Sequence, residues 1–337
     1  GRVLIIAHRD ELIRQAAEKL HAATGLAAAV EKAEESAEGC MERVIVASVQ
    51  TLLSEKRRDS IWRPTHIIVD EAHHAVSPSY MAVLEHWPDA KVLGVTATAD
   101  RSDKKALGTF FESLAYEYHL PQAISEGYLA PIRALTLPTT VDLGQVGPPQ
   151  NGDWSAQQCA TALDPYIPTL SAQFAEHARD RKGLVFVPLR ATGKKVRAAL
   201  ESAGLRAYYC DGEDRSQIPA YLADGNGSVI VNAMLLTEGW DHPPVSALAV
   251  WRFTKSRAFY AQMVGRGTRL SPDTGKENLL LLDNLFLCDT HQLCRPAHIM
   301  TDDDDVAEAM TDAAEKSATD GCDLDEAAVA EAKEQVQ

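Results

Sequence analysis

Apolar runs alternate with amphipathic stretches along most of this chain, and this alternation limits the fold more than any other feature. Runs rich in Val, Ile and Leu lie at 2–8, 43–48, 66–70 and 91–97 and are typical of buried strands. Residues 9–20, after the first run, place their apolar side chains on one helical face, with acidic residues first and Lys19 last. Strand runs separated by such helices predict a parallel sheet with helices on its faces.

A second alternation of the same kind begins after a connector at 120–131 and a loop rich in Gly and Pro at 141–154. Its apolar runs lie at 183–188, 205–212, 227–234, 245–253 and 278–283, with helical patterns between them. We therefore predict an α/β fold with two parallel-sheet domains in tandem, over residues 1–125 and 126–295, followed by an acidic tail at 296–337. A length of 337 residues fits two domains.

The net charge of −15 is concentrated at the C-terminal end. Residues 301–337 hold thirteen acidic and two basic residues, a charge of −11, which leaves −4 on the other 300. This acidic, Ala-rich composition is typical of disordered or weakly helical chain, and we expect an acidic tail that is mainly disordered. The overall charge therefore does not exclude nucleic acid as a partner.

Six scattered cysteines favour free thiols in a reducing compartment. Cys288, His291, Cys294 and His298 lie close in sequence, but their spacing is not a standard zinc pattern, and we expect no metal there. The sequence has no run of eighteen apolar residues and no signal-peptide pattern. We expect a cytoplasmic protein without a membrane partner.

Two carboxylates, Asp70 and Glu71, directly follow the apolar run at 66–70. Ligands of open parallel sheets bind outside the carboxyl ends of the strands. A carboxylate there suits a nucleotide-bound Mg²⁺, and its neighbour can orient or deprotonate an attacking water. The alternative for an Asp-Glu pair alone is an acidic helix start that caps its own amides.

Seven short motifs then occur in one order along the chain. They read "IIAHRDEL" (5–12), "ASVQTL" (47–52), "VDEAHH" (69–74), "GVTATADR" (94–101), "GLVFVP" (183–188), "LLTEGWDHP" (235–243) and "QMVGRGTR" (262–269). In this order the chain resembles the DEAH-type helicases and translocases of superfamily 2, in particular their bacterial and phage members, with the motifs matching Ia, Ib, II, III, IV, V and VI.

The resemblance implies two RecA-like domains that bind ATP and Mg²⁺ between them, with nucleic acid across both. Asp70 would hold the metal through water, Glu71 would activate the hydrolytic water, and His73 would couple the ATP side to the second domain. Further positions carry over in the same way: Thr96 and Thr98 to coupling, Gln262, Arg266 and Arg269 to the phosphates, and Gly239 and Asp241 to the nucleotide edge of the cleft. Two arginines three residues apart share a helical face and can stabilise charge on a transferred phosphoryl group.

Nucleic-acid contacts are implied for five other residues, namely His8, Arg9, Gln50, Thr51 and Thr237. Such contacts position the phosphate backbone without reading bases. Two alternatives stay open: Thr51 caps a helix, and His8 is a satisfied histidine near the core.

One motif of the family is missing. A phosphate-binding loop reads G-x-x-x-x-G-K-[ST], whereas the two Gly-Lys pairs, at 193 and 275, have neither the earlier Gly nor the following Ser or Thr. The sequence opens at Gly1 on motif Ia, and we interpret it as an inactive fragment whose first strand and phosphate loop are absent. We predict an ATP-dependent helicase or translocase acting on DNA. The alternatives are an RNA helicase and a binding module that hydrolyses nothing.

Overall fold

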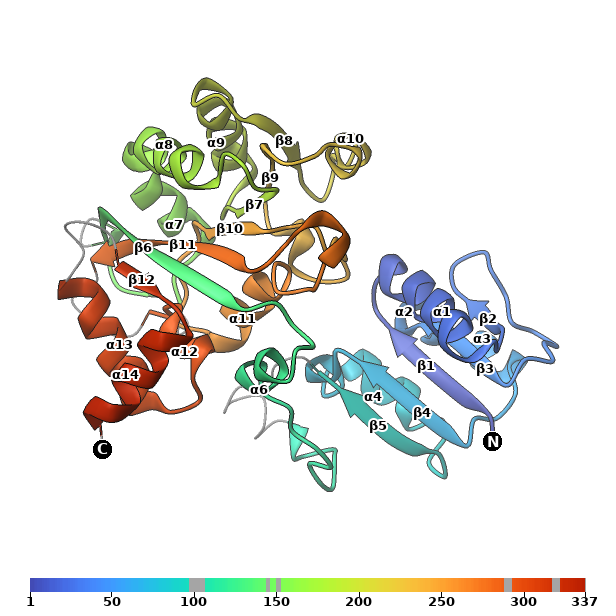
Figure 1. Cartoon of the computed structure of the whole chain (residues 1–337). Coiled ribbons are helices and arrows are strands. Elements are labelled where there is room, and N and C mark those ends of the chain that lie inside the picture. The colour runs from blue at the N-terminus through green and yellow to red at the C-terminus, as the bar shows by residue number, and fades with distance from the viewer. Residues whose placement is uncertain (97–106, 144–145, 150–152, 288–292, 317–321, 337) are drawn as a thin grey trace. The chain divides into compact units, whose positions relative to one another are not determined.

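The computed structural model describes residues 1–96, 107–143, 146–149, 153–287, 293–316 and 322–336 (Figure 1). The chain divides into two compact units, Gly1–Glu117 and Tyr118–Gln337. The division therefore lies eight residues before the boundary predicted after residue 125, and the predicted acidic tail belongs to the second unit.

The first unit is built on a five-stranded parallel sheet with the order β2-β3-β1-β4-β5. Its strands are β1 (Val3–Ala7), β2 (Ala28–Glu31), β3 (Val44–Ser48), β4 (His66–Asp70) and β5 (Lys91–Val95). Four of them match the predicted apolar runs. The sequence analysis missed β2, a short Ala-rich strand at one edge of the sheet.

Helices cover both faces of this sheet. Helix α1 (Asp10–Thr24) packs Ile13 against Ala7 and Val46 on one face. On the other face, α2 (Val49–Leu52) and α4 (Pro78–Leu84) bury Leu52 and Val83. The short helices α3 (Glu55–Ser60) and η1 (Ala72–His74) complete the unit.

The second unit contains a seven-stranded sheet with the order β12-β6-β11-β10-β7-β9-β8. Its strands are β6 (Ile132–Asp142), β7 (Gly183–Phe186), β8 (Arg206–Cys210), β9 (Ser228–Asn232), β10 (Ala247–Val250), β11 (Leu279–Leu287) and β12 (Cys322–Leu324). All pairs are parallel except β12 with β6. Two parallel-dominated sheets in one chain confirm the predicted α/β fold class, although β6 and β12 were not predicted.

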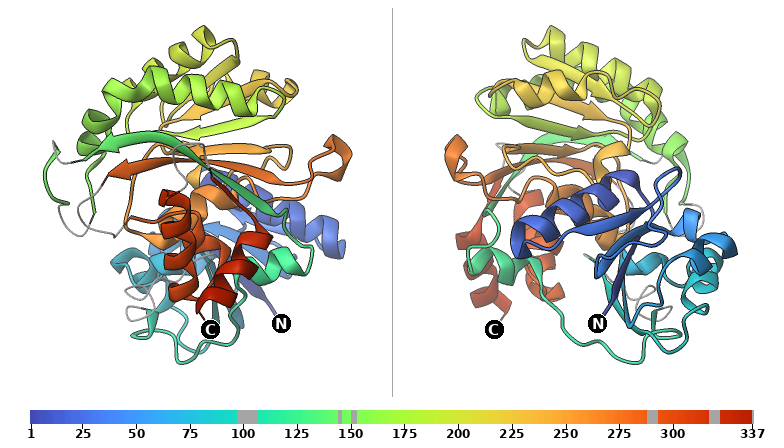
Figure 2. Two further views of the ribbon diagram at one scale, coloured as in Figure 1. Left: turned by 60° about the vertical axis from the view of Figure 1, so that its left-hand side comes forward. Right: turned by 90° about the vertical axis from the view of Figure 1, so that its right-hand side faces the viewer.

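The helices of the second unit separate onto the two faces of its sheet (Figure 2). One face carries α8 (Ile167–Ala178) and α9 (Arg190–Ser202), with α7 (Ala156–Leu163) and η3 (Asp164–Tyr166) leading into α8. The other face carries α10 (Ile218–Ala223), α11 (Arg257–Gly265), α12 (Ala297–Met300), α13 (Asp304–Lys316) and α14 (Glu326–Val336). The remaining elements are α6 (Leu120–Ser125), η4 (Leu235–Thr237) and η5 (Pro272–Thr274). In the described part of the chain, no helix combines the length and apolarity needed to cross a bilayer.

The prediction of a disordered acidic tail is wrong for the described residues. Val306 and Met310 of α13 and Leu324 of β12 are buried in the core of the second unit. Strand β12 pairs antiparallel with β6, and the Arg133 guanidinium donates two hydrogen bonds to the Asp323 carboxylate, at 2.9 and 2.6 Å. The apolar residues of α13 recur on one face, so a high acidic content conceals an amphipathic helix.

Candidate functional site

The Asp70–Glu71 pair lies where β4 ends, between its neighbours β1 and β5. Asp70 is the last residue of the strand and is half-buried. Glu71 adopts the left-handed conformation, with φ 51° and ψ 56°, and is buried. Its backbone N–H donates to Asp70 Oδ1 at 3.0 Å. This turn is unusual for a residue other than Gly.

His73 lies in η1, directly after this turn. Its Nδ1 is 3.5 Å from Glu71 Oε2 and 3.3 Å from Thr96 Oγ1, just beyond the end of β5. Two residues to which the sequence assigns a coupling role, His73 and Thr96, are therefore in contact. Thr98 lies outside the described residues.

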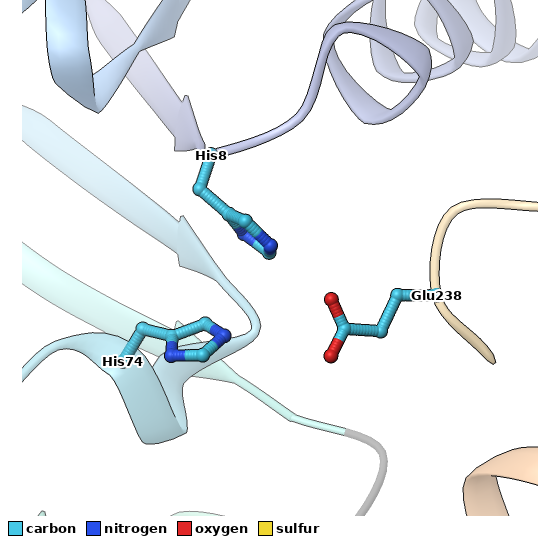
Figure 3. Close-up of side chains that lie close together, drawn as sticks. All are labelled: His8, His74 and Glu238. Carbon is cyan, nitrogen blue, oxygen red and sulfur yellow. The ribbon is translucent and has the colours of Figure 1, made fainter. Parts of the chain in front are cut away.

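Two further histidines of the first unit stack beside this turn. His8, which follows β1, and His74, in η1, have ring centroids 4.7 Å apart in an edge-on arrangement (Figure 3). The rings of His73 and His74 are 4.1 Å apart. The motif Ia histidine is thus brought to the same edge of the sheet as the carboxylate pair. Glu238, also drawn in Figure 3, follows η4 in the second unit.

A groove of about 410 Å³ lies at the ends of β1 and β3 in the first unit. It is lined by Asp10, Ile13, Lys32, Ala33, Ser48, Gln50 and Thr51. Gln50 Nε2 donates to the His8 carbonyl at 3.0 Å, which joins motif Ib to motif Ia. Arg9 precedes α1 and does not line the groove.

Thr51 does not cap a helix, since it lies inside α2 rather than before it. Its Oγ1 instead accepts a hydrogen bond from the Ala33 N–H at 2.9 Å and so holds the turn that follows β2. The hydroxyl keeps its own proton as a donor.

In the second unit, Arg266 follows α11 and binds the loop that carries motif V. Its Nε donates to the Thr237 carbonyl at 2.8 Å and its Nη1 to the Trp240 carbonyl at 2.9 Å. The hydroxyl of Thr237 donates to the Met234 carbonyl at 3.1 Å. Gly239, between the two carbonyls that Arg266 binds, has a φ of 71°, which a side chain would strain.

Arg269 pairs with the other candidate in that loop, Asp241. Its Nε lies 2.8 Å from Asp241 Oδ1, and the two side chains are 30% and 23% exposed. Arg269 Nη1 has no hydrogen-bond partner among the residues that the structure describes. Gln262 lies on α11, one turn before Arg266, and is half-buried.

Burial shifts two pKa values near this loop. It lowers the pKa of His242 to about 4, with a smaller effect from the positive charge of Lys182. It also lowers the pKa of Lys276 to about 8, helped by Arg269 and Arg181. Lys276 belongs to the second Gly-Lys pair, which the sequence analysis weighed only as a phosphate loop.

The cysteine and histidine cluster is only partly described. Cys294 Sγ donates to the Lys255 carbonyl at 3.3 Å, and His298 Nδ1 accepts from the Arg295 N–H at 3.0 Å. Cys288 and His291 lie outside the described residues.

Comparison with known proteins supports the interpretation of both units. The family described as "Type III restriction enzyme, res subunit" matches residues 1–101, and "Helicase conserved C-terminal domain" matches residues 165–271. The chain is 30% identical over 304 residues to irc3 of Schizosaccharomyces pombe and 28% identical over 282 residues to IRC3 of Saccharomyces cerevisiae. Both are named as candidate ATP-dependent helicases, the former mitochondrial. The chain is a superfamily 2 helicase-type protein.

Several solved structures share this fold. A fragment of a candidate HsdR subunit of a type I restriction enzyme from Vibrio vulnificus has a TM-score of 0.63 and 21% identity, covering 84% of this chain and 52% of that one. The restriction-modification enzyme LlaBIII bound to DNA has a TM-score of 0.59 and 15% sequence identity. The match covers 92% of this chain and 27% of that one. Dbp5 of Saccharomyces cerevisiae bound to RNA and ADP BeF3 has a TM-score of 0.56 and 14% sequence identity. The match covers 86% of this chain and 72% of that one. These neighbours are tandem RecA-like domains, and so are the two units here.

The chain spans about half the length of its relatives. The alignments cover 85% and 79% of this chain but only 48% of the fission-yeast relative and 41% of the budding-yeast one. The comparisons thus establish the superfamily and the fold.

Proposed function

We propose that the chain is the motor part of a nucleic-acid helicase or translocase that hydrolyses ATP with Mg²⁺, and that DNA is its substrate. One observation carries the proposal: the turn after β4 leaves Asp70 at the strand end and places Glu71 against His73, which in turn contacts Thr96. A metal-bound phosphate and an attacking water need different carboxylates within a few ångströms of each other.

The donor set at this turn suits the expected metal. Asp70 offers carboxylate oxygens at a half-buried strand end, the ligand type and partial solvation that Mg²⁺ prefers. When bound, Mg²⁺ would neutralise charge on the phosphates. Glu71 would accept a proton from the attacking water. The His73–Thr96 contact would couple a movement of Glu71 to the end of the neighbouring strand β5.

The arginines of motif VI have different parts in this proposal. Arg266 uses Nε and Nη1 on carbonyls of the motif V loop, and so shapes that loop. Arg269 forms an ion pair with Asp241 through Nε, while its Nη1 can donate a hydrogen bond to an anionic oxygen. We therefore assign direct stabilisation of the transferred phosphoryl group mainly to Arg269.

The groove at the ends of β1 and β3 is the proposed path of the nucleic-acid backbone. Gln50 and Thr51 line it, and Lys32 supplies positive charge. A structural neighbour bound to DNA and another bound to RNA both share the fold, so the fold does not choose between them. DNA is favoured because the match over residues 1–101 is to a restriction-enzyme family.

A phosphate-binding loop has to be supplied for the test, because these 337 residues contain no G-x-x-x-x-G-K-[ST] sequence. With such a segment joined in front of Gly1, we expect ATP turnover that single-stranded DNA stimulates. Glu71→Gln should reduce turnover at least about a hundredfold, the scale of general-base catalysis, and leave ATP binding intact.

The matched control is Glu85→Gln, which changes an exposed glutamate at the end of α4 and should leave turnover unchanged. Equal turnover in Glu71→Gln and the parent would remove Glu71 from the mechanism. Nucleic-acid binding without any turnover, despite the added loop, would favour the alternative of a binding module. Stronger stimulation by RNA than by DNA would reassign the substrate.

A further inference from the structure

Lys276 is held entirely by backbone carbonyls. Its Nζ donates to Pro243 O at 3.0 Å, Gly267 O at 2.6 Å and Arg269 O at 2.6 Å. An ammonium group has three donors, so all are used. Gly275, with a φ of 72°, makes the turn after η5 that directs Lys276 back toward these carbonyls.

The three carbonyls come from two different motifs. Pro243 ends the motif V loop, which carries Asp241, whereas Gly267 and Arg269 belong to motif VI. Asp241 and Arg269 are the two partners of the ion pair between these motifs. Lys276 therefore binds the backbone on both sides of that pair.

The motif VI backbone is also fixed from its other side. The Ala130 N–H donates to Thr268 O at 2.6 Å, and Leu129 bridges Arg269. Gly267 packs so closely on Leu279 that an added Cβ would lie 2.5 Å from its Cδ1. Arg266 joins motif VI to the start of the motif V loop through the Thr237 and Trp240 carbonyls, and Lys276 joins the Arg269 side of motif VI to the end of that loop.

We propose that Lys276 is a positioning residue, which sets the direction of the Arg269 guanidinium by fastening motif V to motif VI. The role of Arg269 toward ATP rests on the proposed function, but the fastening itself does not. It can be measured in this chain without nucleotide, so failure of one proposal is distinguishable from failure of the other.

The chain offers a matched control in Lys182. Its Nζ also donates to three carbonyls, those of Tyr221, Leu222 and Asp224. Those carbonyls lie at the end of α10 and belong to neither motif. Lys182→Met therefore removes an equally bonded ammonium from the same unit without unfastening motif VI.

The test is solvent exchange of the Arg269 Nε proton, followed by NMR in protein labelled with ¹⁵N-arginine. In Lys276→Met we expect exchange to accelerate about fivefold, the factor that a partly exposed ion pair such as Arg269–Asp241 supplies. Lys276→Arg keeps the charge but offers a planar fork, and should restore part of the protection. Lys182→Met should leave Arg269 unchanged at a comparable loss of stability.

Two results would overturn the proposal. One is exchange in Lys276→Met within about twofold of the parent, below the factor expected from loss of the Arg269–Asp241 ion pair. The other is equal acceleration in Lys182→Met, which would mean that general loosening explains the effect. If Lys276→Met fails to fold, Lys276→Gln, which retains two N–H donors, is measured against the same thresholds.

Discussion

At the scale of single residues, several charged side chains around motifs V and VI donate hydrogen bonds to backbone carbonyls. Arg266 and Lys276 donate five hydrogen bonds to carbonyls around motifs V and VI. Charge-assisted bonds of this kind are stronger than neutral ones and rigidify what they join. Arg266, to which the proposed function gives a role, therefore also stabilises the fold, and experiments have to separate the two effects.

Alanine substitutions at the two arginines of motif VI should lower the free energy of unfolding by different amounts. Arg266→Ala removes two bonds from a charged donor to the motif V loop, and should lower the free energy of unfolding of the second unit by about 2 kcal/mol or more. Arg269→Ala removes one partly exposed ion pair, worth about 1 kcal/mol or less. Urea unfolding of both variants measures the difference. Equal losses would contradict the division of roles.

In an ATP-hydrolysing form, both arginine variants should lose turnover. Arg269→Ala should lose about a thousandfold or more, on the scale of an arginine finger. Arg266→Ala should lose a similar factor, because the motif V loop, which we propose contacts the nucleotide, would lose the two hydrogen bonds that shape it. Near-parent turnover in Arg269→Ala, measured where the variant is folded, would show that its Nη1 does not meet the phosphate.

His242 predicts a dependence of stability on pH. Its pKa is about 4 in the folded chain and near 6.5 in the unfolded one, so between these values the unfolded state binds more protons. Stability of the second unit should therefore fall as pH falls from about 6.5 toward 4. His242→Gln should flatten this slope in urea midpoints taken at several pH values. An unchanged slope in His242→Gln would contradict the shift.

The sequence predicted which residues cluster in the first unit better than it predicted what they bond to. His8 meets His74, and His73 meets Thr96, because the ends of neighbouring strands in a parallel sheet meet at one edge, and that is readable from apolar runs. The left-handed turn at Glu71 and the carbonyl partners of Arg266 are not readable, because backbone conformation at a single residue and a bond across 29 positions depend on tertiary packing. Nothing in the sequence indicated the role of Lys276, which was noticed only because its Gly-Lys pair does not match a phosphate-binding loop.

At the scale of elements, the acidic C-terminal segment completes the second sheet rather than leaving it. Strand β12 covers the β6 edge, which would otherwise expose unpaired backbone groups. Arg257, at the start of α11, donates to Thr301 O at 2.9 Å and lies 3.3 Å from Asp302. The helix that carries Gln262 is therefore bonded to the segment that composition alone predicts as disordered.

Removing residues 301–337 should accordingly destabilise the second unit, whereas a disordered tail could be deleted without loss. Met310→Ala isolates the packing contribution. A fully buried methionine cut back to alanine should lower the free energy of unfolding by about 2 to 5 kcal/mol. Glu308→Ala, on the exposed face of the same helix, should change it by less than about 0.5 kcal/mol. Chemical denaturation measures both variants. Equal changes in the free energy of unfolding would mean that the segment does not pack on the second unit and would support disorder.

The elements that the sequence analysis missed share a physical reason. Strand β2 is short and Ala-rich, and β6 contains polar residues and a proline that dilute its apolar pattern. Both gain their strand conformation from pairing with β3 and β11, which local propensity does not encode. Strands buried on both faces, such as β3 and β10, were found because such burial requires continuous apolar runs.

At the scale of the whole molecule, the two units differ in how well their sheets are covered. Among the described residues, β5 pairs only with β4, so it forms an edge of the first sheet. Leu93 and Val95 of this strand are 51% and 49% exposed. In the second unit, both faces of the seven-stranded sheet carry helices, and β12 covers one edge. A smaller unit with an apolar edge is expected to be the less stable one.

This difference yields a prediction for the 337 residues alone. Limited proteolysis should cut within Gly1–Glu117 first and leave a fragment of the second unit. Leu93→Lys places a charge on the exposed edge and should reduce aggregation, whereas Leu270→Lys, at a similarly exposed position away from any strand, should not. Cleavage that begins in the second unit would contradict the ranking.

The same chain should hydrolyse no ATP above background, with or without single-stranded DNA. Asp70 can place a metal usefully only while phosphates are held beside it, and the loop that holds them in proteins of this kind is not in the sequence. Turnover should therefore stay at the level of the Glu71→Gln variant, measured side by side at saturating ATP. Hydrolysis that DNA stimulates and that Glu71→Gln abolishes would show that other residues of these 337 form the phosphate cradle, and the search for them would begin at the edge strand β5.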